Sequence, residues 1–230
     1  VWVSTPEDTA SARMGESIYR FGLREIPGAL RRGWKIELER LAKRDLPAWH
    51  YSNPILQSYL VSAGVALLLL AWVGLLAIPY LLIHHLVAYL FLTTANYIEH
   101  YGLLRDRETN GRYERCQPHH SWNSNHVLSN LVLFHLERHS DHHANPLRRY
   151  QSLRHFDGVP SLPNGYLGML VAAWIPPLWF RVMDARLMAL PHVAGDLDKV
   201  NIEPQARPSL VLKWGREKMA EPTFTDLPGL

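Results

Sequence analysis

Histidines are crowded into one part of the sequence. Seven of the 13 histidines lie between positions 119 and 143, and His139, His142 and His143 fall within the pentapeptide HSDHH. Side chains three and four residues apart share one side of a helix, so these three imidazoles can converge. Neutral imidazole is the commonest metal ligand among side chains and suits zinc, copper, iron and nickel. The spacing therefore predicts a metal site built on a helix.

A further histidine, His100, stands at the end of a long apolar stretch, in the motif NYIEHYG. If the long apolar stretch spans a membrane, His100 lies at the membrane boundary. A second apolar stretch, residues 127–136, precedes HSDHH and would bring that motif back to the same boundary. Ionisable residues at such a boundary are functional candidates by default. A surface cluster of ordinary histidines is the alternative. We predict four metal ligands: His100, His139, His142 and His143.

Ligating histidines usually donate their second ring N–H to an oxygen, so nearby carboxylates and amides are candidates for hydrogen bonds to the imidazoles. These candidates are Glu99, Glu137, Asp141, Asn123 and Asn125. Three other histidines stay open between direct ligation, hydrogen bonding to the ligands and a structural role: His119, His120 and His126.

An uncharged segment occupies the middle of the chain and must deliver His100. Residues 55–98 contain no Asp, Glu, Lys or Arg. One membrane-spanning helix needs about 20 apolar residues, and a straight helix of this length would rise about 66 Å, roughly twice the hydrocarbon thickness. We therefore predict a hairpin of two helices that turns near Gly74 and Pro79. A buried helix pair of a soluble protein is the alternative.

Basic side chains flank this hairpin on both sides. Residues 24–45 are rich in Arg and Lys, and eight arginines follow between positions 105 and 154. Positively charged flanks stay in the cytoplasm, so both ends of the hairpin are predicted on that side. The net charge of +3 is too small to indicate nucleic acid as a partner. The single cysteine, Cys116, allows no disulfide within the chain and no CxxC metal site.

Periodicity and proline predict the remaining segments. Apolar residues spaced by three or four predict an amphipathic helix over 13–43, kinked or divided at Pro27, that lies on the membrane or packs on its own domain. Residues 166–183 are apolar but broken by Pro176-Pro177, which favours an interfacial helix. The predicted domains are a cytoplasmic basic and amphipathic helical segment (1–53), a transmembrane helix hairpin (54–99), a cytoplasmic histidine-box region with the interfacial helix (100–195) and a polar tail or linker (196–230).

Several separated motifs resemble those of bacterial membrane-bound alkane 1-monooxygenases. They are NYIEHYGL (96–103), RCQPHHSWNSNH (115–126), RHSDHHA (138–144), LPNGY (162–166) and TPEDTASARMGESIYRF (5–21). The similarity covers nearly the whole chain apart from the polar tail. The resemblance implies an all-α integral membrane protein, part of a six-helix transmembrane bundle with a histidine-rich cytoplasmic helical cap.

The same resemblance implies a non-haem diiron enzyme of the bacterial inner membrane, with its active site on the cytoplasmic side. Such an enzyme uses O₂ to hydroxylate medium-chain n-alkanes to 1-alkanols and takes electrons from rubredoxin, which a rubredoxin reductase reduces. The residues that match the family's iron ligands are His100, His139, His142 and His143. Basic groups could dock the acidic carrier electrostatically. The candidates are Arg31, Arg32, Arg148 and Arg149.

The chain departs from the family pattern in two ways. The family's first two histidine boxes are absent, so the remaining ligands of the two irons are expected upstream of Val1. Glu137 stands where the family more often has Gln. The alternative enzymes are a membrane diiron desaturase and a hydroxylase of fatty acids or aromatic side chains. A histidine-rich membrane metal transporter or sensor is the non-enzyme alternative, although the spans offer only His84 and His85.

Overall fold

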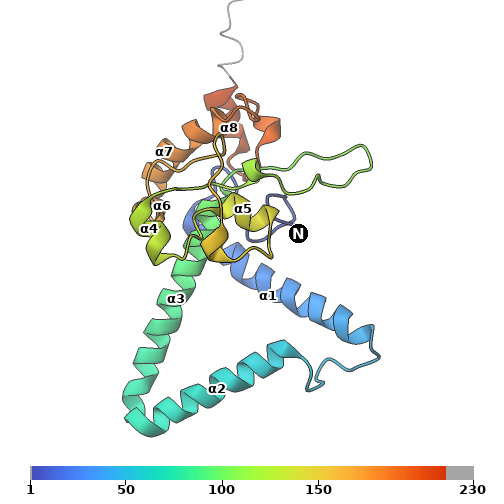
Figure 1. Ribbon diagram of the computed structural model, residues 1–230, viewed down its shortest axis with the longest axis vertical. Coiled ribbons are helices and arrows are strands. Elements are labelled where there is room, and N and C mark those ends of the chain that lie inside the picture. The colour runs from blue at the N-terminus through green and yellow to red at the C-terminus, as the bar shows by residue number, and fades with distance from the viewer. Residues whose placement is uncertain (1, 216–230) are drawn as a thin grey trace, which may run out of the picture. The chain divides into compact units, whose positions relative to one another are not determined.

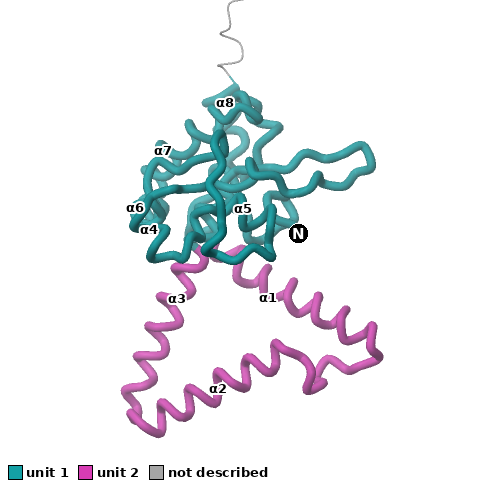
Figure 2. Tube along the Cα trace, in the orientation of Figure 1, with its two compact units in different colours: residues 1–21, 94–230 teal, residues 22–93 magenta. Residues whose placement is uncertain are grey.

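The helices are the regular secondary structure of the part that the structure describes. The computed structural model describes residues 2–215 of the 230 residues. Between these limits it contains eight α-helices, four short 3₁₀ helices and no β-strand beyond isolated bridges, as the all-α prediction requires (Figure 1). The residues form two compact units (Figure 2). Unit 2 comprises residues 22–93, and unit 1 comprises the rest of the described chain.

The predicted turn of the apolar segment lies where the sequence places it. Helix α2 (Pro54–Val73) is capped by Asn53, whose side chain accepts the N–H groups of Ile55 and Leu56. It ends at Gly74, whose φ of 73° favours glycine. The 3₁₀ helix η1 (Gly74–Leu76) follows and leads into α3 (Ala77–His100). Pro79 lies in the first turn of α3. The backbone N–H groups of a first turn have no acceptor within the helix, so a proline there removes no helical hydrogen bond.

The helical segment Pro54–His100 is the one stretch of the described chain that is long and apolar enough to cross a membrane. Its 47 residues would rise about 70 Å as a straight helix, more than twice the hydrocarbon thickness of about 30 Å. With 20 residues in α2 and 24 in α3, each helix alone has the length of one crossing. No residue of α2 is buried in the structure.

The amphipathic segment forms one helix, α1 (Ile18–Ala42), within the predicted range of 13–43. Pro27 lies inside this helix, so of the two predicted effects, a kink or a division, the division is wrong. A proline removes one main-chain hydrogen bond at a cost of about 3 kcal/mol. The many other bonds of a 25-residue helix can absorb that loss.

Aromatic side chains hold the end of α3 inside unit 1. Tyr97 and Tyr101 are one helical turn apart, and both rings contact Trp179 of α7 (Pro176–Met188), with centroids 5.1 and 5.3 Å away. All three side chains are fully buried. Because Tyr97 and Tyr101 occupy the packed side of the helix, Glu99 and His100 face another side.

The apolar region 166–183 is interrupted as predicted. Helix α6 (Tyr166–Ala173) stops before the two prolines, and Pro176 and Pro177 open α7. Proline at a helix start fits because that position needs no amide hydrogen bond. Trp174, just after α6, donates its indole N–H to the hydroxyl of Thr94, 3.1 Å away. The two other α-helices around the histidines are short: α4 (Val127–Val132) and α5 (His139–Ala144).

The predicted tail begins with residues that belong to the core of unit 1. Between positions 196 and 215, Val200 and Leu210 are buried, the second in α8 (Arg207–Trp214). The main chain here also bonds to distant segments: Met14 donates to the carbonyl of Asn201, 2.7 Å away, and Asn201 donates to that of Gly102, 2.9 Å away. Residues 196–215 therefore do not form the predicted polar tail or linker. Residues 216–230 lie outside the described part.

Candidate metal centre

The end of α3 delivers His100. The helix terminates at this residue, and Gly102 reverses the chain with a φ of 71°. A Cβ on Gly102 would lie 2.2 Å from a methyl carbon of Leu187 in α7, so only glycine permits this close approach. The imidazole of His100 is 4% exposed. Packing behind the helix end therefore fixes the position of this side chain.

Asn123 holds the first turn of α5, which carries the HSDHH histidines. Its side-chain oxygen accepts the N–H of Ser140, 2.9 Å away, and its amide donates to the hydroxyl of Ser140, 2.6 Å away. The main chain of Asn123 pairs with the carbonyl of Pro160 and the N–H of Leu162. A helix of only six residues is not stable by itself, so these bonds position the histidines.

Three imidazoles converge in unit 1. The Nε2 atom of His139 is 2.8 Å from Nε2 of His143 and 3.1 Å from Nε2 of His100. One ring nitrogen from each residue lies within 4.8 Å of the other two, which is close enough for all three to bind one ion. His139 is 4% exposed and His143 is half-buried. The structure thus brings together three of the four predicted ligands.

His142 lies beside this group without joining it. Its ring centroid is 5.6 Å from that of His139 and 5.4 Å from that of His143. Successive residues of a helix are rotated by about 100° around its axis. The side chains of His142 and His143, three and four positions after His139, therefore point in directions about 100° apart. His139 and His143 therefore share one focus, and His142 faces a neighbouring direction.

The hydrogen bonds of His100 leave one ring nitrogen free for a metal ion. Its Nδ1 atom lies 3.3 Å from the carbonyl oxygen of His120, which can only accept a hydrogen bond. A proton on Nδ1 leaves Nε2, the nitrogen that faces His139, with an unshared electron pair. This carbonyl also accepts the hydroxyl of Ser4, 2.7 Å away. Outer partners of this kind orient metal-binding histidines.

Electrostatics keep these imidazoles neutral. Burial lowers the pKa of His139 well below its ordinary value, and the nearby imidazoles of His100 and His143 add to the effect. Burial likewise lowers the pKa of His143 to about 3. Nε2 of His139 lies close to Nε2 of both His100 and His143. Nε2 of His100 offers only a lone pair, and a neutral His139 carries at most one proton on Nε2. That one proton cannot make a hydrogen bond in both contacts. A bound transition-metal cation would satisfy all three nitrogens, so the donor set fits iron or zinc.

The five predicted oxygen partners do different things. Glu99 places Oε2 3.2 Å from Nε2 of His139. Glu137 accepts the N–H of Tyr166 and the amide of Asn130, and Asn123 holds α5. The other two contact cationic side chains: Asp141 binds Arg148, and the exposed Asn125 accepts from Arg138. Of the five, only Glu99 has a direct contact with a metal-site imidazole among the hydrogen bonds and ion pairs described.

A second group, Glu114, His119 and His120, also has donor atoms within 4.8 Å of one another. Its hydrogen bonds disfavour a metal ion, however. Nδ1 of His120 accepts the N–H of Gln117, 2.9 Å away, so the proton of this neutral ring must sit on Nε2. That nitrogen faces Oε1 of Glu114 at 3.2 Å, as a donor. Burial lowers the pKa of His120 to about 3, which keeps the ring neutral.

The remaining histidine of this motif, His126, is exposed at the start of α4, with Nδ1 3.4 Å from the hydroxyl of Ser129. We therefore assign His120 and His126 structural roles.

Comparisons with known proteins identify the family of the chain. The fatty acid desaturase family model matches residues 1–169, which is more than half of the chain. The chain belongs to the fatty acid desaturase family. This family member is 50% identical to alkane 1-monooxygenase 1 of Alcanivorax borkumensis, over 97% of this chain and 55% of the relative. It is 52% identical to an alkane 1-monooxygenase of Pseudomonas putida, over 92% of this chain and 52% of the relative.

A more distant relative is the hydroxylase component of xylene/toluene monooxygenase from Pseudomonas putida. It is 29% identical to this chain, over 80% of the chain and 48% of the relative. This family member thus spans about half the length of the curated relatives that it matches.

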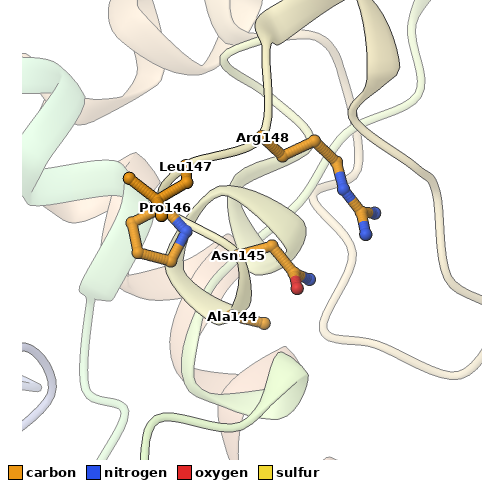
Figure 3. A pocket seen from close by; sticks show the side chains of 5 residues that line it. All are labelled: Ala144, Asn145, Pro146, Leu147 and Arg148. Atoms are coloured by element: carbon orange, nitrogen blue, oxygen red, sulfur yellow. The ribbon is translucent and has the colours of Figure 1, made fainter.

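Arg148, one of the predicted carrier-docking residues, attaches the loop after α5 to that helix. Its guanidinium binds the buried carboxylate of Asp141, with Nη1 2.6 and 2.9 Å from the two oxygens. A shallow hollow in this loop is lined by residues 144–148, and none of the three converging histidines lines it (Figure 3). Arg149 is exposed beside it, whereas Arg31 and Arg32 belong to α1 in unit 2.

Sequence reasoning missed Ser4 as part of the site. This buried residue has a φ of 55°, and its N–H donates to the hydroxyl oxygen of Ser11, 2.8 Å away. Its own hydroxyl reaches the carbonyl of His120, 116 positions further along the chain. The one signal that could have indicated Ser4 was its position next to the family motif TPED, because no local periodicity links it to the histidines.

Proposed function

We propose that this family member is the metal-binding part of an alkane 1-monooxygenase, which hydroxylates the terminal methyl group of medium-chain n-alkanes with O₂. The observation that carries the proposal is the convergence of His100, His139 and His143 in a chain about 50% identical to curated alkane 1-monooxygenases. In this proposal the three histidines and His142 supply part of the ligand set of a diiron centre.

The residues of this chain would hold and shield the centre. The iron supplies the O₂ chemistry when bound, because breaking a terminal C–H bond requires a strong metal-based oxidant. His100, His139 and His143 offer neutral ring nitrogens, and the carbonyl of His120 keeps the proton of His100 on Nδ1. Trp122 is buried, and its backbone N–H donates to the carbonyl of Glu99. Its side chain would help to exclude water behind the ligands.

An apolar substrate needs an apolar route. We propose that α2 and α3 form a transmembrane hairpin within a six-helix bundle, with the histidines at the cytoplasmic side of the bacterial inner membrane. The uncharged segment 55–98 and its basic flanks support this placement. Between α2 and α3, a hollow is lined mainly by apolar side chains together with Tyr80, His84 and His85. Such a wall can receive an alkane chain from the bilayer.

The proposed electron donor is rubredoxin, reduced in turn by a rubredoxin reductase. Arg31 and Arg149 are exposed and could meet an acidic carrier, while Arg148 is held by Asp141. Charge reversal at Arg31 and Arg149 should slow reduction and weaken its salt dependence. Arg186, an exposed arginine of α7, gives the matched control. The two variants are tested separately, and unchanged reduction rates at every salt concentration for either one would contradict docking at that arginine.

Product analysis tests the activity. The whole protein, in membranes supplied with rubredoxin, its reductase, O₂ and octane, should form 1-octanol, which gas chromatography measures. His139→Ala should abolish the product and lower the bound iron, whereas His126→Ala should leave both near the unchanged level because His126 is exposed outside the centre.

The family assignment and the xylene/toluene relative favour two alternatives, desaturation of fatty acyl chains and hydroxylation of aromatic methyl groups. Oleoyl products or benzyl alcohols in place of 1-octanol would establish one of them. Reversible metal binding with no oxygenated product would favour a transporter or sensor.

A further inference from the structure

The side chain of Glu99 contacts His139, but the hydrogen bonds of the site do not explain why a carboxylate is buried there. Glu99 is the penultimate residue of α3, and its side chain is 4% exposed. Its carbonyl accepts the N–H of Trp122, 2.9 Å away, so the backbone on which the carboxylate stands is fixed. One carboxylate oxygen, Oε1, has no hydrogen-bond partner among the described residues. Buried carboxylates are normally paired, hydrogen-bonded or bound to a metal, so this one requires an explanation.

The direction of the second oxygen is informative. Oε2 of Glu99 lies 3.2 Å from Nε2 of His139, the same nitrogen that faces His100 and His143. A carboxylate that only orients a ligating histidine contacts the ring nitrogen that points away from the metal. In His139 that nitrogen is Nδ1, which meets no partner at full hydrogen-bond geometry in the described part of the chain, and the backbone group that interacts with the ring is that of Leu136, not Glu99. Glu99 therefore stands on the ligand side of the ring.

The neighbouring carboxylates show what a purely structural role looks like here. Glu137 is fully buried, and its two oxygens accept the N–H of Tyr166 at 2.7 Å and the amide of Asn130 at 3.2 Å. Asp141 is also fully buried, and both of its oxygens receive Arg148. Glu99 contrasts with both, because its close contact is with Nε2 of His139, a neutral ring that cannot form an ion pair with it.

Tyr166 provides the remaining polar group near Glu99. Its hydroxyl is buried, and its pKa is raised well above the ordinary value by burial and by the nearby carboxylates of Glu99 and Glu137. The hydroxyl does not reach hydrogen-bond geometry with any described residue. The phenol interacts with the carboxylate of Glu99 outside ordinary hydrogen-bond geometry, so it satisfies that carboxylate only weakly.

We propose that Glu99 is an oxygen ligand of the metal centre, bound through Oε2 beside the imidazoles of His100, His139 and His143. This inference rests on the proposed function, since it takes the bound ion to be iron. Carboxylate oxygens bind iron together with imidazole nitrogens in mixed ligand sets. A mixed set also supplies one negative charge, which the neutral histidines lack.

Mössbauer spectroscopy of the whole protein loaded with ⁵⁷Fe tests the ligand. Glu99→Gln keeps the size of the side chain and removes the anionic oxygen. We expect it to change the isomer shift or quadrupole splitting of at least one iron and to speed iron loss to a chelator about tenfold or more. Glu99→Asp should restore part of the retention. Glu137→Gln, the matched buried carboxylate, should keep the unchanged spectrum.

Direct observation of the iron-loaded, unsubstituted protein by cryo-electron microscopy keeps the test decisive where a variant fails to fold. An oxygen of Glu99 within coordinating distance of an iron supports the proposal. Iron that is present with Glu99 out of coordinating distance, or a Glu99→Gln spectrum identical to the unsubstituted one, overturns the proposal and leaves the proposed function standing. Absence of iron from the unsubstituted protein overturns both.

Discussion

Replacing Asp141 with asparagine should loosen the segment that follows the metal-site helix without removing any imidazole. The carboxylate of Asp141 is fully buried. It accepts two bonds from Arg148, at 2.6 and 2.9 Å, one from the backbone N–H of Arg154 at 2.8 Å and one from Asn145 at 2.7 Å. Asparagine keeps a single acceptor oxygen, and its amide N–H₂ would face the guanidinium of Arg148, donor against donor.

The expected cost follows from these contacts. A hydrogen bond to a charged group contributes about 1.5–3 kcal/mol, and breaking a buried ion pair costs about 3–5 kcal/mol. Arg148 is 24% exposed, so water can recover part of its loss. We therefore expect the free energy of opening residues 145–154 to fall by about 2–3 kcal/mol. That change makes the open state roughly 30 to 150 times more populated.

Hydrogen–deuterium exchange of the whole protein measures this opening directly, because protected amides exchange through local unfolding. The amides of residues 145–154 should exchange faster in Asp141→Asn by the factor above. Asp157→Asn, at an exposed carboxylate, is the control and should exchange like the unsubstituted protein. An acceleration of less than about threefold in Asp141→Asn would refute the reasoning, since the lost bonds would then contribute well under 1 kcal/mol.

Three further predictions concern the support of α3. Gly102→Ala should destabilise unit 1 by at least about 2 kcal/mol in thermal melting, from the positive φ and the contact with Leu187, whereas Gly158→Ala, at φ 76° with open space around it, should cost about 1 kcal/mol. Tyr101→Phe should cost about 1–3 kcal/mol, because the phenol donates to the buried carboxylate of Asp184, 2.8 Å away. Burial outweighs this bond and raises the pKa of Asp184, so stability should fall as pH rises from about 4 towards neutrality, and Asp184→Asn should flatten that dependence.

The sequence by itself determined the elements that are set by neighbours along the chain. The uncharged run 55–98, the break at Gly74 and the new helix at Pro176 follow from hydropathy and from the backbone limits of glycine and proline. The spacing of HSDHH likewise predicts that imidazoles share one side of a helix. These signals are local, with a period of a few residues, and they need no knowledge of what packs against them.

Tertiary structure decided which of those imidazoles meet. Spacing alone admits both His142 and His143, and only the approach of His100 from α3 selects the direction that His139 and His143 share. The proton of His100 is placed by the carbonyl of His120, 20 positions away.

The same holds for the carboxylates and for residues 196–215. Glu99 and Asp141 are equally close to histidines in sequence, yet one faces Nε2 of His139 and the other faces Arg148. Val200 enters the core although its segment is polar. Contacts between residues far apart in the chain depend on how the helices pack, and no periodicity of a few residues encodes that packing.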